Sequence, residues 1–204
     1  MNPTAKCPTA DNERRTPEWL IESARQVLGT IDLDPASDES GNLRVKAVDY
    51  FDKEDDGLNQ LWLGSVFLNP PGGRLDAETF KPTSRPQNAV SSAAVWWSKL
   101  LHEITEGRCT EAIYICFNLE AMLNTQKFAP LPIQAFTFCV PAKRVEYPSV
   151  NGGNSSSPAG ASAIVYVGNN PEKFRSEFKN YGHVQKGLSL AEFLEEIEKC
   201  TDRS

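Results

Sequence analysis

The run Asn69-Pro70-Pro71-Gly72 follows directly after an apolar segment, Ser65 to Leu68. Each proline fixes the backbone angle φ and removes a backbone N–H donor, so this turn presents mostly oxygen acceptors, including the side-chain oxygen of Asn69. Such acceptors suit a planar amino group, which has two N–H bonds to donate. Accepting both bonds holds the nitrogen in place and leaves its lone pair free to attack an electrophile. This is the chemistry needed to methylate the exocyclic amine of adenine or cytosine, or the amide of glutamine. A strand that simply ends in a proline-rich turn is the structural alternative.

A second candidate is the run Asp32-Leu33-Asp34-Pro35-Ala36-Ser37. An acidic residue at the carboxyl end of a strand in an open α/β sheet faces the ligand crevice. There Asp34 can accept hydrogen bonds from a ribose or pair with the ammonium group of a ligand. Asp-Pro is also a common turn signal, so a purely structural role stays open. Because neighbouring strand ends lie roughly 5–10 Å apart, we expect Asp34 and Asn69 to flank one crevice.

Hydrophobic periodicity and turn residues predict the elements that position these residues. Helices are expected over 16–28, 90–106, 119–126, 171–181 and 190–200, with Thr16 as N-cap and Pro17 at the first position of the first helix, and a capping box of Ser189 and Glu192 opening the last. Strands are expected over 30–33, 65–68, 112–117, 135–140 and 161–167. Residues 36–42 and 72–88 are predicted to be irregular, 43–51 to be a strand or irregular, and 149–160 to be a flexible loop.

Alternating strands and helices predict a mostly parallel sheet. No helical pattern separates the last two predicted strands, so these strands should pair antiparallel. The expected fold class is therefore α/β, a Rossmann-like sheet that is mostly parallel with a C-terminal antiparallel hairpin. By analogy at the level of the fold, this is the pattern of class I S-adenosylmethionine methyltransferases.

Bulk properties predict one soluble globular domain. The chain has 204 residues, 40% of them hydrophobic, and we expect residues 1–15 to be a disordered leader and 16–204 to form the domain. No apolar run is long enough to cross a membrane, and the polar N-terminus does not have the pattern of a secretory signal. Five cysteines without a Cys-x-x-Cys pair, and only two histidines, argue against a metal centre and favour reduced thiols in a cytoplasm. A net charge of −6 excludes a protein coated in basic residues but leaves room for a local DNA-binding patch.

Several short motifs occur in a specific order along the chain. They are Thr16-Pro17-Glu18-Trp19-Leu20, Leu33-Asp34-Pro35-Ala36-Ser37, Asn42, Tyr50-Phe51, Asp56-Gly57-Leu58, Trp62 and Asn69-Pro70-Pro71-Gly72. This set, which covers residues 16–73, resembles the phage-type, Dam-like DNA N6-adenine methyltransferases. A weaker similarity continues through Trp96-Trp97, the strand at 112–117, Arg144-Val145-Glu146-Tyr147 and the strand at 161–167.

The resemblance implies a Rossmann-like fold, S-adenosylmethionine as methyl donor and adenine in DNA as substrate, in the cytoplasm of a bacterial or phage-infected cell. Asn69, Pro70 and Pro71 would bind the target amine. Asp34, with Pro35, Ala36 and Ser37, would lie in the cofactor site, and Thr16 and Pro17 would close over the methionine end of the cofactor. DNA contacts are expected from basic residues in loops, namely Arg74, Lys81, Arg85, Lys143 and Arg144.

The sequence departs from the family pattern in two places. Gly72 stands where the family has an aromatic residue that stacks on the extruded base, a contact worth about 1–3 kcal/mol. We expect Tyr50, Trp97 or Tyr147 to supply a ring instead, with Tyr50 favoured because it belongs to the ordered motifs. The chain also lacks the Gly-x-Gly turn that often follows the first strand, and offers only Ser37, Ser40 and Gly41 there.

Two other functions remain open from the sequence. The same amine chemistry would serve cytosine N4, RNA or the glutamine amide of a protein. A degenerate member of the family would bind nucleic acid, or a partner, without catalysis.

Overall fold

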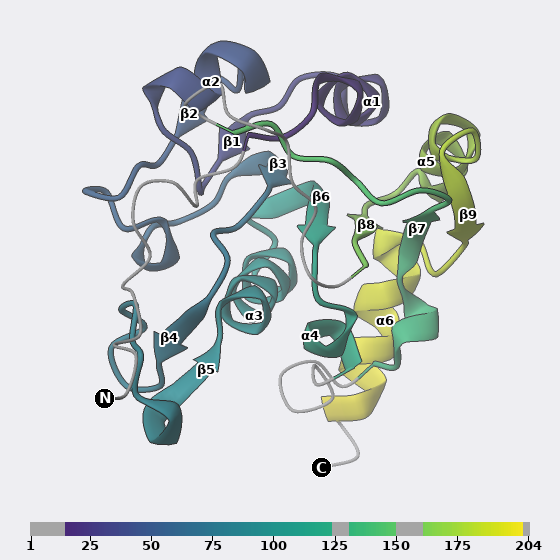
Figure 1. Ribbon diagram of the computed structural model, residues 1–204. Helices are drawn as coiled ribbons and strands as arrows, with labels where there is room; N and C mark the ends of the chain where they lie inside the picture. The colour runs from purple at the N-terminus through teal and green to yellow at the C-terminus, as the bar shows by residue number, and fades with distance from the viewer. Residues whose placement is uncertain (1–14, 124–130, 150–160, 202–204) are drawn as a thin grey trace.

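A mixed sheet organises the chain (Figure 1). The computed structural model describes residues 15–123, 131–149 and 161–201. Within these residues a seven-stranded sheet has the order β2-β1-β3-β6-β8-β7-β9. Its strands are β1 (Leu33–Asp34), β2 (Asp49–Tyr50), β3 (Gly64–Leu68), β6 (Cys109–Cys116), β7 (Thr137–Pro141), β8 (Ala163–Val167) and β9 (Gly182–Gln185).

Most strands of this sheet run in one direction. Strand β1 pairs parallel with β2 and β3, and β3 pairs parallel with β6. Strand β8 is antiparallel to both β6 and β7, so β7 runs in the same direction as β6, and β9 runs against β7. The predicted α/β sheet is therefore confirmed in outline, including the antiparallel pairing of the strands predicted at 135–140 and 161–167.

Helices cover both faces of the sheet. They are α1 (Glu18–Leu28), α2 (Glu39–Val45), α3 (Ser92–Thr105), α4 (Leu119–Leu123), α5 (Pro171–Phe178) and α6 (Leu190–Thr201). In Figure 1, α1 and α5 lie above the sheet, and α3, α4 and α6 lie below it. This is the layered arrangement that a sheet with two apolar faces requires.

Side chains alternate between these faces and form two cores. On β6, Ile113 and Ile115 pack with α1 and α5, whereas Tyr114 and Cys116 pack with α3 and α6. Successive strand residues point to opposite faces, so an eight-residue apolar strand supplies both cores at once. Because both faces of β6 are buried, the functional groups of this part of the sheet gather at the strand ends.

Helix α2 was not expected from the sequence. Residues 36–42 were predicted to be irregular, and Leu43 and Val45 to be in a strand or an irregular segment, but Glu39–Val45 is helical. The side chain of Asp38 caps this helix by accepting from the Gly41 N–H at 2.7 Å. An N-cap bond satisfies one of the unpaired donors of the first turn, which is enough to fix a short helix that has tertiary contacts.

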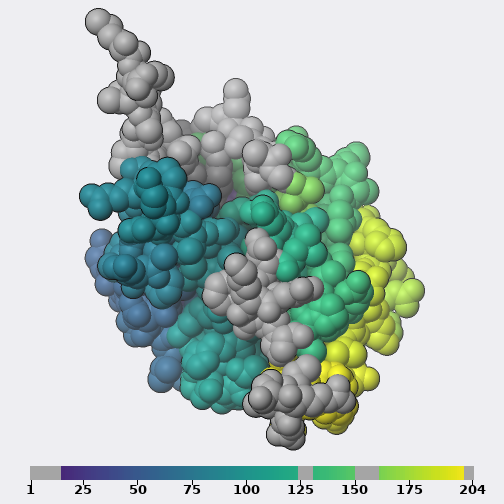
Figure 2. Space-filling model, turned by 90° about the horizontal axis from the view of Figure 1, so that it is seen from below, coloured from purple at the N-terminus to yellow at the C-terminus, as the bar shows by residue number. Residues whose placement is uncertain are grey.

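The segment predicted as a long loop at 72–88 remains mostly a loop, but it joins the two strands of a small hairpin. Strands β4 (Arg74–Asp76) and β5 (Ala89–Ser91) pair antiparallel as a separate two-stranded sheet. The Lys81 ammonium, in the connection between the two strands, lies 2.7 Å from the Asp56 carboxylate, which ties the hairpin to the loop before Trp62. Figure 2 shows the hairpin at the rim of the face formed by α3 and α6. Hydrophobic alternation did not predict these strands, because each has only three residues.

The C-terminal part of the chain matches the sequence more closely. The capping box before α6 is confirmed, because Ser189 N–H donates to Glu192 Oε2 at 2.7 Å and Glu192 N–H donates to Ser189 Oγ at 3.4 Å. Strand β9 was not predicted. Most of the leader predicted at 1–15 and of the loop predicted at 149–160, and the end of the helix predicted at 119–126, lie outside the described residues.

Three cysteines of the sheet are buried thiols. Cys109, Cys116 and Cys139 are free, and burial raises their pKa values to about 12, 11 and 11. Within the described ranges, no cluster of three or more His, Cys, Asp or Glu side chains could hold a metal ion. None of the helices found there has the length and apolarity needed to cross a membrane.

Candidate functional site

Asp34 and Asn69 lie at the same edge of the sheet, as the sequence predicted. Asp34 ends β1, and Asn69 follows the last residue of β3. The register pairs Leu33 with Val66, so Asn69 lies one strand across and two residues beyond the position opposite Asp34. With strands 4.7–4.9 Å apart and a rise of about 3.3 Å per residue, the two Cα atoms are separated by about 8 Å. Both side chains lie on the α1 side by strand alternation, because Leu33 and Leu68 belong to the opposite core.

Thr16 fixes the side chain of Asn69. The Asn69 amide donates from Nδ2 to Thr16 Oγ1 at 2.9 Å, and Thr16 is buried with 7% of its surface exposed. Among the described residues, nothing donates a hydrogen bond to the Asn69 side-chain oxygen. The amide is thus oriented with one N–H donor bonded to Thr16 and its oxygen available to an incoming N–H group.

This contact corrects the helix-capping role that the sequence predicted for Thr16. Helix α1 begins at Glu18, with Pro17 in the N-cap position and no side-chain cap bond. Thr16 is therefore one residue too early to cap the helix, and its hydroxyl bonds to Asn69 instead. Sequence reasoning could not find this bond, because it joins residues separated by 53 positions.

The turn after Asn69 is anchored to helix α3. The Ser92 hydroxyl donates to the Pro71 carbonyl at 2.7 Å, and the Ser92 N–H donates to the Gly73 carbonyl at 3.2 Å. Pro70 is buried and Pro71 is exposed. The Pro71 carbonyl, which the sequence counted among the free acceptors, therefore already accepts a bond, and the Asn69 side-chain oxygen is the acceptor best placed for a ligand.

Asp34 is a buried carboxyl group with weak hydrogen-bond partners. Only 4% of its surface is exposed, and the Ala36 N–H donates to its Oδ1 at 3.3 Å. Burial disfavours the charged form and raises the pKa of Asp34 to about 7, although contacts with Ala36 and Ser37 act in the opposite direction. Such a group gains from a ligand that donates hydrogen bonds or brings a positive charge.

Backbone bonds hold the turn that carries Asp34. The Phe51 N–H donates to the Asp34 carbonyl at 3.1 Å, and the Ser37 N–H donates to the Phe51 carbonyl at 2.9 Å. A Cβ on Gly57 would lie 2.1 Å from the Pro35 carbonyl oxygen, so only glycine fits there. Pro35 is buried under this contact, while Ala36 and Ser37 are half-buried at the edge of the sheet.

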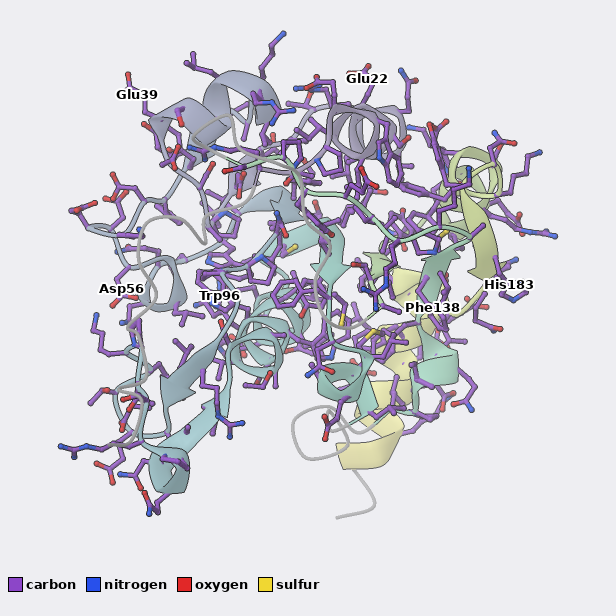
Figure 3. All side chains as sticks on the ribbon, in the orientation of Figure 1. Glu22, Glu39, Asp56, Trp96, Phe138 and His183 are labelled. Carbon is purple, nitrogen blue, oxygen red and sulfur yellow. The ribbon has the colours of Figure 1, made fainter. Side chains whose placement is uncertain are left out.

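Trp62 supports the same turn from below. Its Nε1–H donates to the Gly57 carbonyl at 2.8 Å, and its ring stacks on Trp96 with centroids 5.8 Å apart. Figure 3 labels Trp96 between helix α3 and this loop, and Asp56 at the outer edge. The motif residues Phe51, Gly57 and Trp62 are thus scaffold for the turn and not part of its reactive surface.

Replacing Gly57 with alanine should destabilise the protein by more than about 2 kcal/mol, because the new Cβ forces the 34–37 turn away from its position. Urea unfolding measures the change. Gly72→Ala is the matched control: its Cβ would meet nothing closer than Phe117 Cε2 at 4.0 Å, and stability should change little. Equal stability of the two variants would contradict the close approach of Gly57 to Pro35.

No ring that the sequence proposed for base stacking lies beside Gly72. Trp97 is fully buried, stacked on Tyr114 with centroids 5.2 Å apart, and Tyr147 is 97% buried in the core of α1 and α5. Tyr50 pairs with Asp34 on β2, with β1 between it and Asn69. On this strand Tyr50 lies closer to Asp34 than to the turn Asn69–Gly73. The ring beside Gly72 is that of Phe117, which sequence reasoning did not single out.

Basic residues predicted to contact DNA have different environments. Arg74 lies on β4, next to the Asn69–Gly73 turn, and donates to the Ala89 carbonyl at 2.6 Å. Lys81 forms the ion pair with Asp56 described above. Arg85 and Lys143 are exposed, and so is Arg144, which lies on the segment 142–148 after β7.

Two segments meet over this edge of the sheet. The Arg15 N–H donates to the Pro148 carbonyl at 2.9 Å, which joins the start of the described chain to the end of the 142–148 segment (Figure 1). The Arg15 guanidinium lies 2.9 Å from the Asp38 carboxylate at the start of α2. Arg15 and Thr16 are therefore held from both sides, which supports the position of Asn69.

Comparison with known proteins adds no assignment. No protein-family model and no curated protein matches the chain. A function is therefore inferred from the contacts of Asp34, Asn69 and Thr16 and from the ordered motifs.

Proposed function

We propose that this protein transfers a methyl group from S-adenosylmethionine to the N6 amine of adenine in DNA. The observation that carries the proposal is the Asn69 side chain, which the Thr16 hydroxyl orients at 2.9 Å with its oxygen available. It lies at the carboxyl end of β3, one strand from the buried carboxyl group of Asp34. In open α/β sheets this edge is where ligands bind.

The residues around Asp34 fit the proposed cofactor. Asp34 is a buried acceptor with a single backbone donor at 3.3 Å, so it can take the hydroxyls of a ribose or the ammonium of an amino acid. Pro35, Ala36 and Ser37 form the turn beside it, and Thr16 and Pro17 lie over the same edge. When bound, S-adenosylmethionine supplies a methyl group on a positively charged sulfur, which is already a strong electrophile.

The chain then needs to position the amine and exclude water. Asn69 accepts an N–H bond of the amine through its side-chain oxygen and so directs the nitrogen lone pair away from the turn. Pro70 and Pro71 keep that turn rigid. The adenine must leave the DNA stack to reach Asn69, which is the usual requirement for chemistry on a base. Its N6 loses a proton only after attack, so no strong base is required.

The sheet supports the same proposal by analogy. A reversed strand, β8, lies between β6 and β7, which run in the same direction as each other. A mostly parallel sheet with a C-terminal antiparallel hairpin is typical of class I methyltransferases, although a fold alone does not determine function. DNA would reach this edge past the hairpin β4–β5 and the segment 142–148, in the cytoplasm of a bacterial or phage-infected cell.

Methyl transfer by the purified protein tests the proposal. Labelled S-adenosylmethionine is incubated with amplified bacterial genomic DNA, which contains all sequences and no modified bases, and the DNA is digested for nucleoside mass spectrometry. We expect N6-methyladenine. N4-methylcytosine, or label in RNA or protein instead of DNA, would assign the same chemistry to another amine. Cofactor binding by calorimetry without transfer to any substrate would leave a binding protein and contradict the proposal.

A further inference from the structure

Phe117 lies where the amine-binding turn lacks a side chain. An ideal Cβ on Gly72 would lie 4.0 Å from Phe117 Cε2, with no other heavy atom so near. The parallel register explains this approach: β3 pairs Leu68 with Tyr114 of β6, so the residues after Leu68 run alongside those that end β6 and continue to Phe117. Phe117 is half-buried, and it packs on Ala93, Ala94 and Ala121.

A polar cavity adjoins this ring. Its volume is about 370 Å³, and it is lined by Gly73, Arg74, Ser91, Asn118, Glu120 and Ala121. Gly73 and Asn118 are the chain neighbours of Gly72 and Phe117, so the cavity opens between the turn and the end of β6. The volume falls within the range of about 300–1,000 Å³ for small-molecule sites. Side-chain amide, hydroxyl, carboxylate and guanidinium groups line it, as a heterocyclic base with several polar edge atoms requires.

We infer that Phe117 is the stacking surface for the extruded base, in place of the aromatic residue that the chain lacks at position 72, and that the adjoining cavity receives the edge of the base. The inference rests on the proposed function and adds a residue to its base-binding site. Because residue 72 is glycine, no side chain at that position covers the ring of Phe117, which packs on the three alanines. Stacking on an aromatic face is the usual way in which an unpaired base is held.

Removing the aromatic ring at position 117 and adding one at position 72 tests this inference. In Phe117→Ala, kcat/KM for DNA should fall about 5- to 150-fold, the range expected for one lost base–aromatic stack, while the affinity for S-adenosylmethionine stays unchanged. Adding Gly72→Tyr to Phe117→Ala should restore most of the lost activity, since position 72 does not have a left-handed backbone and its Cβ meets only the ring that has been removed. No recovery in a stable double variant would overturn the inference.

A packing role for Phe117 predicts the opposite pattern. It lowers the melting temperature of Phe117→Ala, leaves single-turnover transfer per folded molecule unchanged, and gains nothing from a ring at position 72. Phe117→Leu keeps the apolar volume without an aromatic face and serves if the alanine variant does not fold. Full activity of the leucine variant would overturn the inference about Phe117. The proposed function would still hold in that case, provided that the wild-type protein transfers methyl groups to DNA. If the wild-type protein methylates no base, both the inference about Phe117 and the proposed function are wrong.

Discussion

Replacing Asn69 with alanine is expected to lower single-turnover methyl transfer to DNA by about 100- to 1,000-fold, the usual effect of removing one preorganised polar group from an active site. The variant loses the acceptor that holds the amine and directs its lone pair. Cofactor affinity should change little, because Asp34 on the neighbouring strand, and not Asn69, is the proposed cofactor contact. Transfer of labelled methyl from saturating cofactor measures the first effect, and calorimetry the second.

Asn69→Asp is the matched control for this prediction. Aspartate keeps an oxygen for the amine, and the Thr16 hydroxyl, which accepts from asparagine at 2.9 Å, can donate to a carboxylate instead. We therefore expect it to retain far more activity than the alanine variant. Near wild-type turnover of Asn69→Ala would refute the role of Asn69, and equal loss in both variants would show that the site needs the amide and not merely an acceptor.

The parts of the site that the sequence predicted are those with a local cause. Strand β3 is a short apolar run that ends in Asn-Pro-Pro, and prolines end a strand by their own geometry. Asp34 ends β1 for a similar local reason, because the residue before a proline is extended and the turn follows at once. With two adjacent parallel strands, their shared carboxyl edge follows from topology alone.

The parts that the sequence did not predict depend on register and on long-range contacts. Phe117 meets Gly72 only because β3 and β6 pair with Leu68 opposite Tyr114. A shift of one residue would move the whole pattern to the other face, and nothing in either segment alone fixes that register. The Thr16–Asn69 bond is of the same kind, since local helix signals favoured a cap at Thr16.

Short elements were missed for a different reason. Helix α2 and the hairpin β4–β5 bury few residues, so neither produces a clear hydrophobic period. Contacts hold them in place instead: the Asp38 cap and its ion pair with Arg15 for α2, and the Lys81–Asp56 pair for the hairpin. The hairpin matters for the proposed base-binding site because Arg74 and Ser91, which line the cavity beside Phe117, come from it.

Asp34→Asn is expected to stabilise the protein at pH 8 and to stabilise it by clearly less at pH 5. The pKa of Asp34 rises from 3.8 to about 7 because the folded chain buries its carboxyl group. Between these values the folded state holds a proton that the unfolded state has released, so the free energy of unfolding falls as the pH rises through this window. Above pH 7 the shift of roughly three units corresponds to at most about 4 kcal/mol, which a neutral amide avoids. Urea unfolding at both pH values measures the difference, with Asp49→Asn at an exposed position of the neighbouring strand as control.

The same variant should lose affinity for S-adenosylmethionine. At pH 8 it is therefore expected to be more stable than the wild type and to bind the cofactor more weakly. A ligand hydroxyl or ammonium favours the charged carboxylate, and wild-type affinity should therefore rise as the pH increases through about 7, whereas the asparagine variant should show weak binding with no such rise. Calorimetric titrations of the wild type and the asparagine variant at pH 6 and pH 8 measure this difference.

A variant that is more stable at pH 8 and still binds the cofactor as tightly as the wild type would show that Asp34 is only a buried carboxyl group. The cofactor would then have to bind away from β1. Loss of binding without a gain in stability at pH 8 would instead show that burial in the folded protein does not disfavour the charged form of Asp34. A gain in stability at pH 8 together with a loss of cofactor affinity would identify Asp34 as a carboxylate whose charge is unfavourable in the free protein and is stabilised by the bound ligand.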